Sequence, residues 1–222
     1  MQLFDQLLQF PLFQGMSRDD LSLVAERTKF DFMKLQSGNI VIAEDDSAQH
    51  LYFLLSGTLS AETAADDRSY KVTEQVNAPF MMQLESLFGY NQRYTRTFKA
   101  MTDAGVLRLE KKEVVRLSEE FLVFRINLLN ILATQSQRAA RQHWHRCPQT
   151  LRERIVRFFN QHCLYPAGSK KFFILMNTLA NELNDSRLNV SRQLNAMERE
   201  QLLVLRRGQI EIPHLEVMSG VK

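Results

Sequence analysis

The chain has 222 residues, of which 45% are hydrophobic and 24% charged, which are ordinary values for a folded globular protein and argue against disorder. No apolar run approaches the roughly 20 residues that a bilayer-spanning helix needs. The first residues, Met1 to Asp5, lack the basic start and small-residue cleavage site of a secretory signal. Two cysteines, Cys147 and Cys163, are too few for a disulfide framework. We therefore expect a cytoplasmic protein with no membrane partner.

The net charge of +3 is unevenly distributed along the chain. Residues 147–222 contain 11 basic and 7 acidic side chains, whereas residues 1–146 contain 17 basic and 18 acidic ones. An excess of positive charge at the C-terminal end permits contact with nucleic acid, but four charges are also compatible with ordinary surface scatter.

Short helices are predicted at the start of the chain. Leu3, Leu7 and Leu8 fall on one helical face, and Pro11 limits how far that helix can run. Ser17 precedes an acidic first turn and is placed to cap a second helix.

From Phe30 to Glu110 the pattern changes to short apolar and β-branched runs. Turn sequences such as Ser37-Gly38-Asn39 and Ser56-Gly57 separate them. Many short strands at close spacing indicate a β-roll, barrel or sandwich. The absence of βαβ alternation and of a glycine-rich loop before a helix argues against a Rossmann or P-loop nucleotide fold. We predict that residues 1–111 form a β-roll with short N-terminal helices.

Residues 112–146 are predicted to form one long helix. Apolar side chains recur there every three or four residues, and no proline or glycine interrupts the run before Pro148. So long an apolar stripe needs an extended cover, which favours dimerisation through the helix over packing against the chain's own roll. The predicted dimer interface consists of Phe121, Phe124, Leu128, Ile131 and Leu132.

Residues 147–222 are predicted to form a compact, mainly helical domain. Pro148 suits a first helical position, and the apolar residues from Leu151 to Phe159 follow with helical spacing. A strand at Phe172 to Leu175 comes next, then two short helices around residues 184–186. The apolar runs at 203–205 and 210–212, with a turn at Arg207-Gly208, predict a β-hairpin.

The two short helices have the pattern of a helix-turn-helix. Four apolar side chains are spaced to meet between the helices: Leu179, Leu183, Val190 and Leu194. Ala180 is small where the helices approach, Asn184 tolerates the left-handed turn, and Ser186 is a natural N-cap. This leaves Arg187 and Arg192 on the outer side, where arginine suits guanine recognition. With the hairpin as a wing, the pattern predicts DNA binding.

The order of these elements resembles the CRP/FNR superfamily of bacterial transcription regulators. The resemblance rests on Phe10-Pro11-Leu12-Phe13, Ser37-Gly38-Asn39, the run from Leu51 to Gly57, the Leu87-Phe88-Gly89 corner, the long helix and the winged helix-turn-helix. It implies an α+β fold with a β-roll sensor, a dimerising helix and a C-terminal DNA-binding domain in a homodimer. It also implies RNA polymerase as a partner if the protein is an activator.

The resemblance assigns base reading to Arg187, Leu188 and Arg192. Members with an Arg-Glu-Arg set have an acid where this chain has Leu188. Leucine contacts a thymine methyl but accepts nothing from a cytosine amine, so we predict a half-site different from that of the cyclic-AMP receptor protein. The predicted phosphate contacts are Ser186, Asn189 and Arg206.

The predicted effector pocket departs from the cyclic-nucleotide pattern. The family's ribose-binding glutamate falls on Leu84 and its phosphate-binding arginine on Tyr94, while its adenine-contacting hydroxyls fall on Ala139 and Ala140. A phosphate would lose its charge-assisted contact, which argues against cyclic AMP. A shifted pocket that uses nearby polar residues stays open as an alternative: Glu85, Thr95 and Arg96.

Other cofactors and an enzymatic role find little support in the sequence. No cysteine precedes Cys147, which argues against an iron–sulfur cluster. His143 and Cys147 leave haem open, although no tight metal-ligand set is present and we predict no metal site. Only His50 lies within the roll, so a cupin-like metal enzyme lacks ligands, and no hydrolase motif occurs. We therefore predict no enzyme, with an empty-roll DNA-binding scaffold and a haem- or gas-responsive sensor as alternatives.

Overall fold

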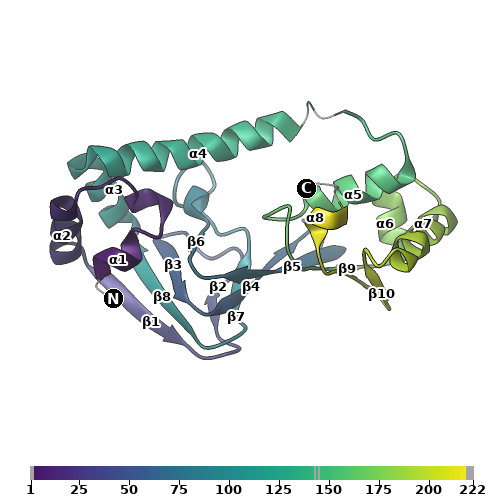
Figure 1. Cartoon of the computed structure of the whole chain (residues 1–222), viewed down its shortest axis with the longest axis horizontal. Coiled ribbons are helices and arrows are strands. Elements are labelled where there is room, and N and C mark those ends of the chain that lie inside the picture. The colour runs from purple at the N-terminus through teal and green to yellow at the C-terminus, as the bar shows by residue number, and fades with distance from the viewer. Residues whose placement is uncertain (1–2, 143, 145, 219–222) are drawn as a thin grey trace. The chain divides into compact units, whose positions relative to one another are not determined.

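The computed structural model describes residues 3–142, 144 and 146–218 (Figure 1). The chain divides into two compact units. Unit 1 consists of Met1–Leu59 and Val76–His145, and unit 2 consists of Ser60–Gln75 and Arg146–Lys222. The backbone therefore passes between the units three times, after residues 59, 75 and 145. Among the described residues, no helix is long and apolar enough to cross a membrane.

Unit 1 begins with three short helical segments. These are α1 (Leu3–Leu7), the 3-10 helix η1 (Pro11–Phe13) and α2 (Arg18–Arg27). The Ser17 hydroxyl accepts a hydrogen bond from the Asp20 amide at 3.1 Å, which confirms the predicted N-cap. Phe10 and Phe13 are almost fully buried, and both rings pack on Phe53 of the roll. The helices therefore cover one face of the sheet below them.

The roll of unit 1 is antiparallel. One sheet has the order β1-β8-β3-β6, and β2 pairs with β7. Along β3, Leu51 and Phe53 face the helices while Leu54 points to the other side, and all three are completely buried, as expected for a strand between two apolar layers. The element bounds are β1 (Phe30–Leu35), β2 (Ile40–Ile42), β3 (His50–Ser56), β6 (Phe80–Met82), η2 (Leu84–Leu87), β7 (Thr97–Ala100) and β8 (Ala104–Glu110).

The predicted single long helix is wrong in one respect, because the structure has two helices. They are α3 (Lys111–Glu120) and α4 (Leu122–Gln142), and Phe121 between them is extended, with φ −119° and ψ 109°. Both helices are anchored in the core, α3 by Leu117 before the bend and α4 by Phe124 after it, and both side chains are fully buried. The sequence has no local helix breaker at this point, so we attribute the interruption of the helix to tertiary packing.

The C-terminal part of unit 2 is a winged helix-turn-helix. The Thr150 hydroxyl and the Glu153 carboxylate form a capping box that starts its first helix at Leu151, so the prediction of Pro148 as a first helical residue is wrong. The wing is an antiparallel hairpin whose turn uses Gly208 at φ 71°. The elements are α5 (Leu151–Gln161), β9 (Lys170–Ile174), α6 (Met176–Glu182), α7 (Arg187–Arg199), β10 (Val204–Arg206), β11 (Gln209–Ile212) and α8 (Leu215–Met218).

A hairpin from the middle of the sequence completes unit 2. It consists of β4 (Thr58–Ala64) and β5 (Tyr70–Asn77), and the strand order is β10-β11-β9-β5-β4. Val72 of β5 is buried in the same core as Phe158, Phe159 and Phe172. The structure thereby confirms the predicted α+β class with a roll, a long helix and a winged helix-turn-helix, and adds the β4–β5 hairpin to the sheet of the winged domain.

Candidate nucleic-acid interface and effector region

The helix-turn-helix forms between α6 and α7. Leu179, Leu183, Val190 and Leu194 are all at most 5% exposed, and Ala180 is 4% exposed. Asn184 has φ 48°, as predicted for the left-handed turn. The buried side chains lock the two helices together, so the opposite face of α7 is held in a fixed orientation on unit 2.

A polar network fixes the start of α7. The Ser186 hydroxyl accepts from the Asn189 amide at 3.2 Å, which confirms the predicted N-cap. The Asp185 carboxylate accepts from the Ser186 amide at 2.7 Å and from the Asn189 side chain at 2.9 Å, and it pairs with Arg154. Hydrogen bonds from Asn189 and Ser186, together with Arg154, lower the pKa of Asp185. Ser186 and Asn189, predicted phosphate ligands, are thus engaged within the chain.

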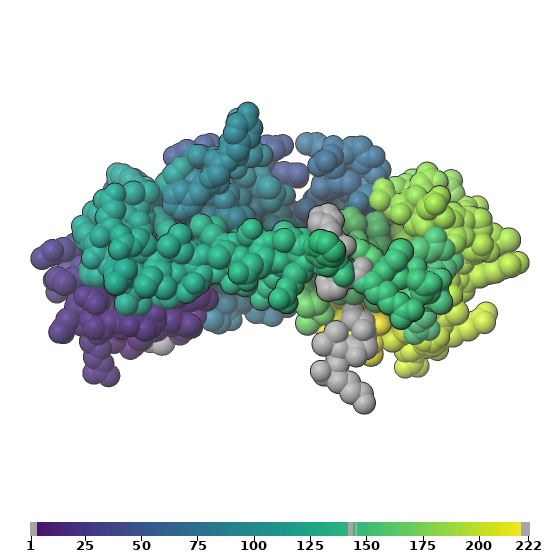
Figure 2. All heavy atoms as spheres, turned by 90° about the horizontal axis from the view of Figure 1, so that it is seen from above, coloured from purple at the N-terminus to yellow at the C-terminus, as the bar shows by residue number. Residues whose placement is uncertain are grey.

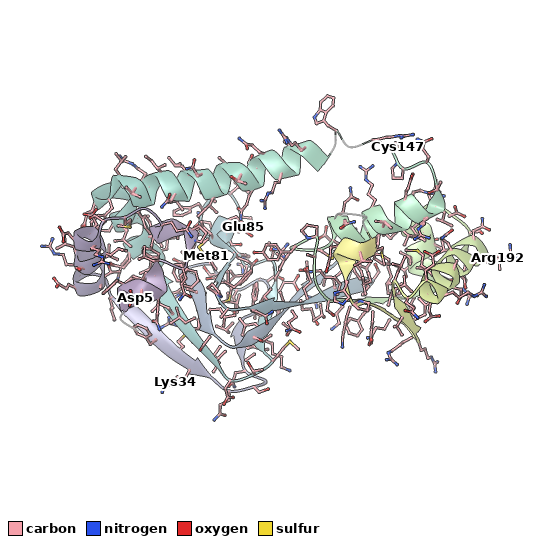
Figure 3. The ribbon with its side chains drawn as sticks, in the orientation of Figure 1. Asp5, Lys34, Met81, Glu85, Cys147 and Arg192 are labelled. Atoms are coloured by element: carbon pink, nitrogen blue, oxygen red, sulfur yellow. The ribbon has the colours of Figure 1, made fainter. Side chains whose placement is uncertain are left out.

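The outer face of α7 presents the three predicted base-reading residues to solvent. Arg187, Leu188 and Arg192 are all exposed, Leu188 at 59%. Among the described residues, neither arginine has an acidic partner, and Figure 3 shows Arg192 pointing away from the helix. Two unpaired guanidinium groups on one protruding helix are suited to hydrogen bonding with base edges.

The sequence analysis assigned no DNA contact to two residues of this surface, Asn195 and Arg207. Asn195 is exposed three residues after Arg192, within hydrogen-bond distance of the Ser191 hydroxyl, and helical spacing alone could have identified it. In the wing, the predicted phosphate ligand Arg206 pairs with Glu211 at 3.1 Å. Its neighbour Arg207 is exposed and has no acidic partner among the described residues, so it is the freer cation of the wing.

The predicted effector residues do not form one pocket. Leu84 and Tyr94 are 1% and 3% exposed and belong to the core of unit 1, so their placement in the pocket is corrected. The Tyr94 hydroxyl donates to the His50 carbonyl, and burial raises the pKa of Tyr94. Ala139 and Ala140 are exposed on α4. The packing of Leu84 and Tyr94 leaves only the polar residues as candidates for a ligand site.

The polar candidates are bound to one another and to a residue that sequence reasoning missed. Gln83, 5% exposed with φ 43°, accepts from both the amide and the hydroxyl of Thr95 at 2.8 Å and donates to the Arg96 carbonyl at 3.3 Å. Glu85, which lies below α4 in Figure 3, is 3.9 Å from Arg96 and accepts from Gln135 of α4 at 3.3 Å. The buried Gln83 side chain thus satisfies backbone groups of Thr95 and Arg96, next to Tyr94, the position that the resemblance assigns to a phosphate-binding arginine.

The metal and haem alternatives gain no geometric support. His143 lies outside the described residues, Cys147 is exposed, and Cys163 is partly buried. Among the described residues no three His, Cys, Asp or Glu side chains lie close enough to share a metal ion.

The predicted dimer interface is only partly at the surface. Phe124 is completely buried against Phe13, and Leu128 is 8% exposed, so these two residues pack within their own chain and their assignment to the interface is corrected. Phe121, Ile131 and Leu132 are partly buried. A different stripe of α4 is exposed: Leu122, Ile126 and Leu129, at 58%, 46% and 59%. Figure 2, which views the chain from the side of α4, shows the helix uncovered at the surface.

Comparison with known proteins agrees with this architecture. Residues 32–121 match the family model of the cyclic nucleotide-binding domain. The catabolite activator protein of Thermus thermophilus is 21% identical, with 95% of this chain and 97% of that chain covered and a TM-score of 0.52. A transcriptional regulator of the CRP/FNR family from Eubacterium rectale is 18% identical, with 95% and 97% covered and a TM-score of 0.53.

A third match covers a smaller share of this chain. The sensor domain of the transcriptional regulator DNR from Pseudomonas aeruginosa is 20% identical, with 66% of this chain and 94% of that chain covered and a TM-score of 0.52. No curated protein matches the sequence. The resemblance predicted from the sequence is confirmed at the level of the fold: residues 32–121 match the model of the cyclic nucleotide-binding domain, and over nearly its whole length the chain has the same fold as these solved CRP/FNR-type structures.

Proposed function

We propose that the protein is a homodimeric transcription regulator of the CRP/FNR type, which binds a specific pseudo-palindromic DNA site and is not an enzyme. One observation carries the proposal: α7 projects Arg187 and Arg192, free of acidic partners among the described residues, from a helix-turn-helix with a basic wing. A helix of this kind fits the major groove, where arginine binds guanine in a bidentate manner.

The residues of the α7 surface divide by role. Arg187, Leu188 and Arg192 read bases, and Asn195 extends the same face. Leu188 favours a thymine methyl, so the half-site differs from one read through a glutamate. Ser186, Asn189 and the wing arginines position the unit on phosphates, which sets affinity and salt dependence more than sequence choice.

The homodimer is proposed to form along α4. Leu122, Ile126 and Leu129 are spaced by four and three residues, which is the spacing of a coiled-coil seam. A helix of 21 residues is about 32 Å long, so pairing along it offers an extended contact. Two recognition helices would then enter successive major grooves about 34 Å apart.

The roll is proposed to work without a cyclic nucleotide held in the family's manner. Gln83 occupies the hydrogen-bonding groups of Thr95 and Arg96, and Tyr94 replaces the arginine that would bind a phosphate. A DNA-binding scaffold with an empty roll, or a haem- or gas-responsive sensor of the same fold, are the alternatives. Thermal shift with cyclic AMP, and a visible spectrum after haem loading, separate these cases.

The decisive experiment is binding selection from fragmented genomic DNA with the purified chain. We expect enrichment of a pseudo-palindrome whose half-sites lie one helical turn apart. The Arg187→Ala, Arg192→Ala double variant should lose the enrichment, whereas Arg18→Ala, which removes an exposed arginine from α2, should retain it. Recovery of unrelated fragments with the native chain would refute sequence-specific binding.

A further inference from the structure

An arginine of the preceding helix holds the turn of the helix-turn-helix. Helix α5 packs beside α7 (Figure 1), and its Ile155 and Phe159 are completely buried in the core of unit 2. Arg154 therefore extends from a fixed backbone. Its Nη1 atom donates to the Leu183 carbonyl at 2.9 Å and to the Asn184 carbonyl at 3.4 Å. One side chain thus closes the carbonyl end of α6, where backbone acceptors have no partner within the helix.

The same guanidinium group also reaches the start of α7. Its Nη2 atom donates to Oδ2 of Asp185, whose Oδ1 atom accepts from the Ser186 amide and from the Asn189 side chain. Asp185 comes directly before the N-cap, so its carboxylate lies at the positive end of the helix dipole. Arg154 and Asp185 together join the end of α6, the left-handed turn and the first turn of α7 into one hydrogen-bonded unit.

A second ion pair joins α5 to the other end of α7 but is more open to solvent. Arg152 donates through Nη1 and Nη2 to the two carboxylate oxygens of Glu200, at 2.8 and 2.7 Å. These side chains are 40% and 47% exposed, whereas Arg154 and Asp185 are 34% and 16% exposed. Exposed ion pairs contribute little, and this one closes no backbone turn. Arg152 therefore offers a matched control on the same helix.

The Arg154–Asp185 pair lies next to the residues that are proposed to read bases. Asp185 is two residues before Arg187. A hollow of about 370 Å³ at this place is lined by Leu151, Asp185, Asn189, Arg192 and Gln193. Bidentate recognition of a base requires two N–H groups of one arginine to meet two atoms of that base, and a shift of about 0.5 Å already weakens such a site. The orientation of the first turn of α7 should therefore control base recognition.

We propose that Arg154 and Asp185 are a positioning pair for base recognition, which holds the start of α7 so that Arg187 and Arg192 meet the base edges. The inference rests on the proposed DNA-binding function. A pair with this role changes the ratio of the affinities for a selected and a scrambled DNA site. A pair that only stabilises the fold changes the fraction of folded protein, which lowers both affinities by the same factor.

The test replaces Arg154 by lysine in the full-length chain. Lysine keeps the positive charge but lacks the planar fork that reaches Asp185 and two carbonyls at once. We expect Arg154→Lys to weaken binding to the selected site roughly tenfold, the order of one lost bidentate base contact, and to change binding to scrambled DNA less than about twofold. Arg152→Lys should leave both affinities within about twofold of the native values. Fluorescence anisotropy titrations measure both affinities.

Asp185→Asn tests the other member of the pair. Asparagine keeps an oxygen that accepts from Ser186 and Asn189, but it presents no carboxylate to Arg154. We expect the same loss of preference for the selected site. Because the two residues act on one turn, the Arg154→Lys, Asp185→Asn double variant should lose no more than about twofold beyond either single variant.

The outcomes separate this inference from the proposed function. A native ratio of affinities in Arg154→Lys, or fully additive losses in the double variant, would overturn the positioning pair. If Arg154→Lys unfolds the chain in a thermal melt, the ratio measured for Asp185→Asn decides. A native chain that binds the selected and scrambled sites equally would instead refute sequence-specific DNA binding itself.

Discussion

Two arginines on α7 are proposed to recognise DNA bases. Their exposed environment allows the effect of removing them to be estimated. Since neither Arg187 nor Arg192 has an acidic partner among the described residues, removal of either side chain leaves no buried charge behind. We expect Arg192→Ala to weaken binding to the selected site by about 1–3 kcal/mol and to flatten discrimination between bases. Titration of the selected and scrambled sites by fluorescence anisotropy measures both effects. An equal loss of affinity for scrambled DNA would show that Arg192 does not read bases.

Arg207 should behave differently although it is also an arginine. It lies in the turn of the wing hairpin between β10 and β11, where a phosphate is the expected contact. Arg207→Ala should weaken selected and scrambled sites by similar factors and reduce the slope of log K against log salt by about one. Salt titrations of both sites check this. A loss confined to the selected site would show that Arg207 reads bases.

The two cysteines are expected to differ in reactivity. Burial raises the pKa of the Cys163 thiol to about 12, so its reactive thiolate is scarce near neutral pH, whereas Cys147 is exposed. A colorimetric thiol reagent at pH 8 should titrate one thiol rapidly in the native protein and two in denaturant. Cys147→Ser should remove the rapid phase. Two rapid native thiols would contradict the buried position of Cys163.

At the scale of elements, α4 has two apolar faces with different tasks. Ile126→Asp or Leu129→Asp places a charge in the proposed seam between two copies, and we expect sedimentation to show monomers that keep a native circular dichroism spectrum. Phe124→Ala changes the inner face, where the ring packs on Phe13, and should lower the free energy of unfolding by about 3–5 kcal/mol. An unchanged dimer in both aspartate variants would place the interface elsewhere.

Part of the fold could be predicted from local sequence patterns. Local signals such as the Ser186 cap, the left-handed Asn184 and the glycine turn of the wing were all predictable, because each depends on a few neighbouring residues. The bend between α3 and α4 at Phe121 could not be predicted, because no glycine or proline lies there and the bend depends on tertiary packing. The apolar stripe alone also could not tell which residues face the roll.

Contacts between distant segments were least predictable. Glu74 and Lys170 are 96 residues apart, and alternation along the chain predicts strands without naming their partners. Gln83 was missed for a similar reason, since a polar residue next to a buried corner has no sequence pattern that marks it as internal. Its hydrogen bonds with Thr95 and Arg96 exist only because the fold brings the two loops together.

At the scale of the whole molecule, the backbone passes between the two units three times, so a single cut in the chain cannot separate them into complete fragments. A fragment of residues 147–222 should lack the strand that pairs with β9 and should leave Lys170 buried with no counter-charge or exposed at a bare edge. We expect this fragment to melt at a lower temperature and to aggregate, and a synthetic peptide of residues 58–77 added in excess to raise its melting temperature. Scanning fluorimetry with a scrambled peptide as control measures this. An unchanged melting temperature in the presence of the peptide would show that the fragment does not need the hairpin.

Unit 2, the proposed DNA-binding module, is therefore encoded by two separate stretches of the gene, with strands β6 to β8 of the roll and helices α3 and α4 between them. Chimeras that exchange only the C-terminal third between relatives would mismatch one strand of its sheet. Exchange of this module should therefore preserve solubility and operator choice only when the donor protein supplies both stretches. We expect natural recombination at the linker alone to be selected against, because it would not transfer the β4–β5 hairpin.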